Sequence, residues 1–345
     1  MNRTIAALGI LGTMGIGITT FVACGQDTTT PDPGSTEVKA SDVKGTTMAK
    51  FAVNKLVLPT QRSDFAIDLN GDNHPDNQLG NIIGALTAQN LDAQGGVDKS
   101  VTEGSVSILA QVQTADATLK TDPAVGVTLY VGKGFTGMVQ ENDAGVATGC
   151  TGCPDYSGMG MFTIDAAQPT SVFLGKLSGG KFTSNNPVTT KNPIAITLKL
   201  ALISGGAPVS LIVNGAHLQF TATSDGKLTD GQLHGSIKNS DVQGQIIPGV
   251  AMLLSQQVAK DNCMGGTSKQ IASIFDTGMC GSAKAGDCKI DACEVAGNSI
   301  IMNVLAPDVQ IYSDAASTVY APNKLNTTRD SLSLGIGFTA VTGKF

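Results

Sequence analysis

A run of oxygen-bearing side chains between residues 68 and 76 is the clearest candidate for chemistry in this chain. It reads Asp68-Leu-Asn70-Gly-Asp72-Asn-His74-Pro-Asp76. Carboxylate and amide oxygens at the first, third, fifth and ninth positions converge on a hard cation when such a loop curls, and the seventh position can add its carbonyl. The spacing therefore predicts a calcium site. The alternative is an ordinary turn without an ion, because Asp, Asn and Gly populate turns in any case.

Over about nine residues this run resembles the calcium loops of the EF-hand, dockerin and thrombospondin type-3 families. The resemblance implies four side-chain ligands and one carbonyl ligand, namely Asp68, Asn70, Asp72 and Asp76 with His74. Two positions depart from the EF-hand pattern. Asn73 stands where glycine is usual, and Leu79 stands where a bidentate acid is usual. We therefore expect calcium to bind with the weak affinity of extracellular modules.

A degraded echo of such a loop lies near residue 290. Ile290 and Glu294 match positions eight and twelve of an EF-hand loop, but alanines occupy positions one and three and cannot ligate. Our hypothesis is that a disulfide between Cys288 and Cys293 closes this turn in place of an ion. A surface turn unrelated to calcium loops is the alternative.

Cys24 is a second chemical signal. It ends the segment Phe21-Val22-Ala23-Cys24, which follows Arg3 and a long apolar run. A basic start, an apolar stretch and small residues before a cleavage point are typical of a secretory signal. The segment resembles the lipobox of bacterial lipoproteins, in which the cysteine is acylated and becomes the new N-terminus, although Phe21 replaces the usual aliphatic residue. A transmembrane anchor that happens to carry a cysteine is the alternative.

This resemblance implies a signal peptide over 1–23 and attachment to a membrane through a lipid on Cys24. Gly25, rather than Asp, after the lipid-bearing cysteine implies sorting to the cell outer membrane of a Gram-negative host. The sequence as a whole is similar to uncharacterised predicted lipoproteins of such bacteria. It leaves open whether the protein faces the periplasm or the cell surface.

Composition narrows the remaining possibilities. Removal of the signal leaves about 320 residues, enough for one large domain or two smaller ones. The net charge of −6 gives no basic surface for nucleic acid. No later apolar run is long enough to span a bilayer, so attachment should rest on the lipid alone.

The order of patterns along the chain predicts one domain with a tether. Residues 24–50 are rich in Thr, Asp, Pro and Ser and should be a flexible tether. Residues 51–345 should form a single mainly β domain, with α+β as a possibility, and an antiparallel, sandwich-like architecture. Alternating apolar residues predict strands around 105–131, 194–224 and 331–342. Helical spacing predicts a helix over 79–90 and a helical insert over about 241–306.

A hairpin over residues 216–238 can be assigned a register. With Asp225-Gly226 as its turn, Leu218 faces Leu233 on one side of the sheet, and His217 faces His234 on the other. The two histidines could share a transition metal, but two ligands are too few without a carboxylate. A polar, solvent-facing pair is the interpretation that we favour.

Six cysteines remain after Cys24, an even number in an oxidising compartment, and they predict three disulfides. They are Cys150, Cys153, Cys263, Cys280, Cys288 and Cys293. Sequence alone cannot choose among the possible pairings. The spacing favours local closure, with each cysteine bonded to the next along the chain.

No common catalytic motif stands out in the sequence, which lacks a nucleophile elbow, a zincin helix and a Walker loop. We therefore expect a non-enzymatic binding or structural role. Two alternatives stay open, a calcium-dependent secreted hydrolase and a carrier of an apolar ligand. The sequence does not indicate which ligand or protein partner is bound.

Overall fold

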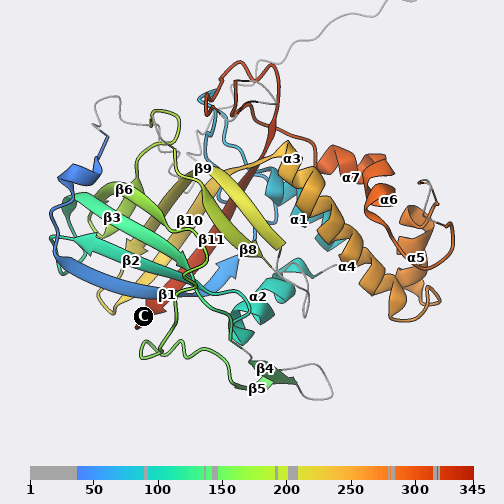
Figure 1. The fold of residues 1–345 in the computed structure, drawn as a ribbon, viewed down its shortest axis with the longest axis horizontal. Coiled ribbons are helices and arrows are strands. Elements are labelled where there is room, and N and C mark those ends of the chain that lie inside the picture. The colour runs from blue at the N-terminus through green and yellow to red at the C-terminus, as the bar shows by residue number, and fades with distance from the viewer. Residues whose placement is uncertain are drawn as a thin grey trace, which may run out of the picture.

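Antiparallel strands that close into a barrel form the body of the protein (Figure 1). The computed structural model describes residues 37–345 apart from 89–91, 136, 142–146, 191–192, 201–208, 279, 281–283, 314–316 and 318. Eight strands complete the barrel in the order β10-β11-β1-β2-β3-β6-β7-β9 and back to β10. They are β1 (Thr47–Val57), β2 (Ile108–Thr114), β3 (Asp122–Val131), β6 (Ser171–Ser178), β7 (Lys181–Ser184), β9 (Val209–Ala222), β10 (Lys227–Lys238) and β11 (Ser331–Thr342).

Three shorter strands lie outside this circuit. Strand β8 (Ile196–Leu200) pairs with the first half of β9, and β4 (Met138–Glu141) pairs with β5 (Ala147–Thr151) in a separate hairpin. The predicted strand over 194–202 is therefore found as β8, while residues 201–208 lie outside the described chain.

The sheet closes into a barrel, which differs from the sandwich-like architecture that the sequence predicted. The prediction of a mainly antiparallel β domain is confirmed, but β9 pairs with both β7 and β10, and β1 pairs with the C-terminal β11. Each of the eight strands pairs with a neighbour on both sides, so the strands form one closed barrel rather than two facing sheets. Alternation in the sequence identifies strands and their faces, and it carries no information on which distant strands pair.

The hairpin between β9 and β10 has the predicted register in its central part. His217 pairs with His234, Leu218 with Leu233 and Gln219 with Gln232. The turn itself differs, because Thr223 N–H donates to Lys227 O across three residues, 224–226, rather than two. A bulge at Asp230, with φ of 49°, inserts one extra residue in β10 and restores the predicted pairing beyond it.

Helices gather on one side of the barrel (Figure 1). They are α1 (Gln78–Ala88), α2 (Ala93–Glu103), α3 (Asn239–Asp241), α4 (Ile247–Ala259), α5 (Gly266–Phe275), α6 (Ala292–Gly297) and α7 (Ser299–Val304), with a 3-10 turn at Ala40–Asp42 and a π-helical turn at Val242–Ile246. Helix α1 confirms the helix predicted over 79–90, and α3–α7 occupy the range where a helical insert was predicted. Apolar residues of α2 and α4 pack into the same core as the barrel interior, so the described helices are not a separate body.

The six cysteines form three disulfides, Cys150–Cys153, Cys263–Cys288 and Cys280–Cys293. Local closure is therefore right for the first pair and wrong for the other two. Helix α5 explains the difference, because its ten residues carry the chain about 15 Å away from Cys263 before Cys280 is reached. The chain then returns, so that Cys288 lies with its Cα 5.8 Å from that of Cys263.

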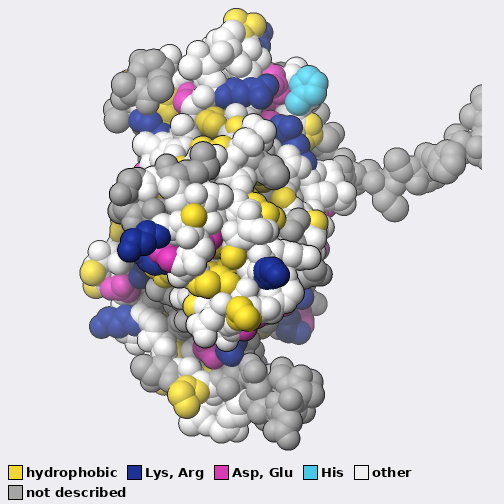
Figure 2. Space-filling view, turned by 90° about the vertical axis from the view of Figure 1, so that its right-hand side faces the viewer, with side chains coloured by type: hydrophobic (Ala, Val, Ile, Leu, Met, Phe, Trp, Pro, Cys, Tyr) yellow, Lys and Arg dark blue, Asp and Glu magenta, His cyan; other side chains and the backbone are white. Residues whose placement is uncertain are grey.

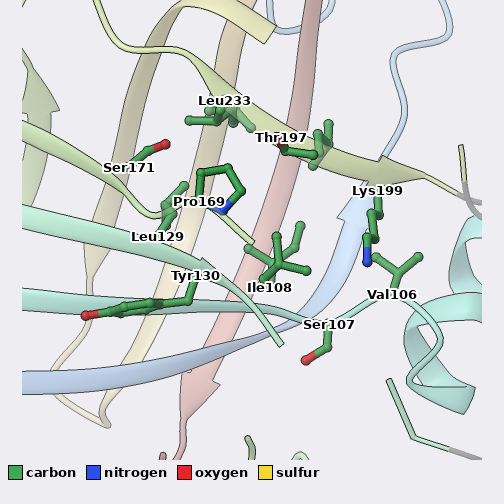
Figure 3. A pocket seen from close by; sticks show the side chains of 13 residues that line it. Val106, Ser107, Ile108, Leu129, Tyr130, Pro169, Ser171, Thr197, Lys199 and Leu233 are labelled. Carbon is green, nitrogen blue, oxygen red and sulfur yellow. The ribbon is translucent and has the colours of Figure 1, made fainter. Parts of the chain in front are cut away.

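Large side chains fill the barrel interior. Phe182 and Phe220 stack with ring centroids 5.0 Å apart, and both are buried together with Phe173. One interior cavity measures about 20 Å³, and a second, beneath β8, measures about 30 Å³. Ile108, Leu129 and Leu233 point toward one another in the second cavity (Figure 3). Spaces of this size hold about one water molecule each.

The described part of the chain begins within the range assigned to the tether. Val38 is buried, and its N–H and C=O bond to the side-chain amide of Asn185 at 3.0 and 2.7 Å. The first strand starts at Thr47, so residues before 51 already belong to the folded domain. Residues 1–23 and Cys24 lie outside the described chain.

The surface beside the helices is mixed in character. Small groups of hydrophobic side chains lie between polar atoms there, and both charge signs are present (Figure 2). Among the described residues, no helix combines the length and the apolar character that are needed to cross a bilayer.

Candidate functional site

The loop predicted to bind calcium lies between β1 and α1 and is fixed to the outer wall of the barrel at β11. The side chain of Asn77 accepts from Gly335 N–H at 2.9 Å and donates to Gly335 O at 3.0 Å. The N–H of Gln78 donates to the Ser333 hydroxyl at 2.8 Å. This close approach needs a glycine in β11, because a Cβ at Gly335 would lie 2.0 Å from the carbonyl oxygen of Phe65.

The loop curls around the side chain of Asp68. Oδ1 of Asp68 accepts from the N–H of Gly71 at 2.6 Å, and its Oδ2 accepts from the N–H of Asn73 at 2.8 Å. Asn73 has φ of 65°, the left-handed conformation that asparagine tolerates better than most residues. Asparagine can therefore replace the glycine of an EF-hand loop here. A bridge between Ile67 and Asp76 closes the loop, with Asp76 N–H donating to Ile67 O at 2.7 Å.

Three predicted ligands converge. Carboxylate oxygens of Asp68, Asp72 and Asp76 all lie within 4.8 Å of one another. Burial first, and then the nearby charges of Asp308, Asp72 and Asp68, raise the pKa of Asp76 to about 7, against a hydrogen bond from Leu69 N–H that lowers it. Such a group of acids repels itself in the absence of a cation and attracts a divalent one.

The side chain of Asn70, a fourth predicted ligand, is buried in the loop, where its Oδ1 accepts from Asp72 N–H at 3.1 Å. His74 is exposed, and its Nδ1 lies 3.4 Å from an Asp72 carboxylate oxygen. Its ring therefore contacts one acid of the cluster from the solvent side. A ligand role for its carbonyl remains a prediction.

Two residues that sequence reasoning did not identify complete this region. The guanidinium of Arg62 lies 3.7 Å from Asp76 and 3.3 Å from Asp308. Asp308 is buried and accepts from the N–H and hydroxyl of Ser333 at 2.8 and 2.6 Å. Burial raises the pKa of Asp308, although Ser333 and Arg62 oppose the shift. No local spacing could have indicated Asp308, because it is more than 200 residues from the loop in sequence.

The weaker echo near residue 290 is held together without a Cys288–Cys293 bond, so that hypothesis is wrong. Asp276 accepts from Gly286 and Cys288 N–H at 2.7 and 2.8 Å. Glu294 is buried and accepts from Thr277, Gly278 and Asp291 N–H groups. Backbone N–H groups thus donate hydrogen bonds to the carboxylates of both Asp276 and Glu294. Cys263 and Cys288 also lie near Asp276, but they form a disulfide and offer no thiolate for a metal.

His217 and His234 lie on the outer face of the β9–β10 hairpin as predicted, but they are buried rather than solvent-facing. Their exposed fractions are 7% and 0%. Segments from far along the chain lie against neighbouring strands, with the Phe65 ring over Gly337 in β11 and Tyr320 over Gly215 in β9. The sequence of the hairpin alone does not indicate that its outer face is covered by distant segments of the chain.

Comparisons with family models, curated proteins and solved structures found no match for this chain. Functional inference therefore rests on the residues of the chain and on their arrangement.

Proposed function

We propose that this protein is a lipid-anchored lipoprotein of the bacterial outer membrane, and that its barrel domain is stabilised by a calcium ion in the loop from Asp68 to Asp76. Its role is binding or structural rather than enzymatic. The convergence of three carboxylates within 4.8 Å is the observation that carries the calcium assignment. The lipobox-like segment ending at Cys24 carries the assignment of the anchor.

A structural role suits the position of the proposed ion. The loop is bonded to β11 through Asn77, and the Arg62 guanidinium joins Asp76 to Asp308 of the segment before β11. Leu69, inside the loop, packs with Val309 and Ile311 in a small apolar cluster. An ion that neutralises the loop would hold the β1–α1 connection and the segment before β11 against the same wall of the barrel.

A carrier of an apolar ligand receives no support from the two interior cavities described above. Their volumes of about 20 and 30 Å³ are far below the several hundred Å³ that enclose a typical small ligand.

Calcium is expected to stabilise the protein by about 1.5 to 3 kcal/mol at 10 mM, if its affinity is that of extracellular modules. The Asp72→Ala variant should lose this increment, because it removes a carboxylate from the cluster. Thermal melting of both proteins, in EDTA and in calcium, measures the effect.

Asp116→Ala provides a matched control for this experiment. Asp116 also closes a turn by accepting three backbone N–H groups, from Thr118, Lys120 and Thr121. Its loss should lower the melting temperature with and without calcium and leave the calcium increment intact. Equal calcium increments in the parent and in Asp72→Ala would reject the loop as the calcium site.

Replacement of Cys24 by serine is expected to move the protein from the membrane fraction to the soluble fraction of a Gram-negative host. The serine hydroxyl is not a substrate for the thioether-forming lipid transfer that the lipobox resemblance implies. Fractionation and the intact mass of the parent test this prediction. A parent mass without acyl chains, or a serine variant that stays in the membrane, would contradict the proposed anchor.

A further inference from the structure

Two buried imidazoles on the barrel wall have unused nitrogen atoms. His217 in β9 and His234 in β10 are directly paired, and their ring centroids lie 5.8 Å apart. Nδ1 of each ring is buried and has no hydrogen-bond partner among the described residues. A buried polar atom without a partner costs about 1–3 kcal/mol, so two such atoms on directly paired residues favour a bound group that satisfies them.

The neighbours of His234 favour one tautomer of its ring. Its Nε2 lies 3.2 Å from Oε1 of Gln232, and Gln219 donates its side-chain N–H to the same oxygen at 3.0 Å. An amide oxygen only accepts, so this contact favours the tautomer in which Nε2 of His234 carries the proton and Nδ1 presents a lone pair. Metal-bound histidines commonly donate their other ring N–H to an oxygen in this way.

The second ring is also neutral. Burial lowers the pKa of His217 to about 4, against a hydrogen bond to the backbone of Ser184 that favours the charged form. The imidazole is therefore uncharged at neutral pH and available as a ligand. Two neutral Nδ1 acceptors cannot bond to each other, so a group that satisfies both must be a cation or a hydrogen-bond donor.

The separation of the rings suits one shared ion. A zinc ion lies about 2 Å from each imidazole nitrogen, so two imidazoles at the tetrahedral angle have ring centroids about 5 Å apart, and wider angles raise this to at most about 6.3 Å. The observed separation of 5.8 Å is wider than the tetrahedral value by less than about 1 Å.

A third unpartnered atom lies against strand β9. The Tyr320 hydroxyl is buried without a hydrogen-bond partner and lies against Gly215, two residues before His217. Gly215 leaves the space that the Tyr320 hydroxyl occupies, because a Cβ at this position would lie 2.3 Å from the hydroxyl oxygen. Tyr320 thus adds a further unpartnered polar atom near this part of β9.

We propose that His217 and His234 supply two of the ligands of one divalent transition-metal ion, with Zn²⁺ as the first choice, through their Nδ1 atoms. Nitrogen donors of this kind favour zinc, copper and nickel over calcium. The site is therefore separate in chemistry from the acidic loop, and it stands whether or not that loop binds calcium.

Zinc titration of the full chain tests this site. The protein is purified in detergent, stripped with a chelator, saturated with calcium and titrated with Zn²⁺ by calorimetry. We expect one ion per chain, with affinity reduced at least tenfold in His234→Gln. Asp116→Ala is the control, because Asp116 closes a turn outside both proposed metal sites and its loss should leave the zinc binding unchanged.

The parent protein provides a second test that does not depend on the folding of a variant. With ¹⁵N-labelled histidine, Zn²⁺ should shift the Nδ1 resonances of two of the three histidines. Equal affinity in His234→Gln and the parent, or zinc-induced shifts of His74 alone, would overturn the proposal. A buried water that donates to both nitrogens would then be the group between them.

Discussion

Loss of the Cys263–Cys288 bond is expected to lower the free energy of unfolding by about 3 kcal/mol. The bond spans 25 residues, and closure of a loop of this length in the unfolded chain contributes about that amount. The Cys263→Ser/Cys288→Ser double variant, compared with the parent in urea under oxidising conditions, measures the change. The barrel should unfold in the same transition, because Ile290 and Val295 of the insert belong to the same apolar core as the strands.

The matching Cys150→Ser/Cys153→Ser variant is the control. Its cysteines are only three residues apart, in the β4–β5 hairpin and the turn after it, so the expected effect is smaller. Unfolding of the insert at low urea while the barrel stays intact would contradict the single core.

The pairing itself can be read from a digest. Trypsin cleaves after Lys269, Lys284 and Lys289, which places the four cysteines of the insert on four different peptides. Without reduction, the peptide of Cys263 should be joined to that of Cys288. A Cys263–Cys280 product would show that the local pairing expected from spacing is the correct one.

Several elements could be predicted from residues that lie close together in the sequence. The central β9–β10 register followed from the separation of leucines and histidines on two faces, and helix α1 followed from its apolar spacing. The conformation of Asn73 agrees with a calcium-type loop because asparagine tolerates positive φ. In each case, the information lies within about 20 residues of chain.

Features that depend on distant segments were not predictable in this way. Closure of the barrel requires β1 to meet β11, almost 300 residues later. Burial of His217 and His234 depends on cover from segments around Phe65 and Tyr320, which leave no trace in the pattern of the hairpin. A polar face on a strand therefore indicates which side points away from the barrel interior. It does not show that this side is exposed to solvent.

Acidification is expected to weaken the protein through His217. Its pKa is about 4 in the folded state and 6.5 in the unfolded chain, so the unfolded state binds more protons between these values. The stability is complete above about pH 6.5 and falls by about 3 kcal/mol by pH 4, because each pKa unit corresponds to 1.36 kcal/mol. Burial and the neighbouring His217 lower the pKa of His234 as well, so its contribution has the same sign.

Urea unfolding in EDTA at several pH values between 7.5 and 4 measures this effect. The raised pKa values of Asp76 and Asp308 act in the opposite direction, since protonation of these acids favours the folded state. The comparison between the parent and His217→Gln separates the histidine contribution from that of the acids, because both proteins contain the same acids. The parent should lose about 3 kcal/mol more than the variant over this range, whereas His74→Gln should follow the parent. Parallel curves for the parent and His217→Gln would mean that His217 is already open to water in the folded protein, and such an imidazole could not form a buried metal site.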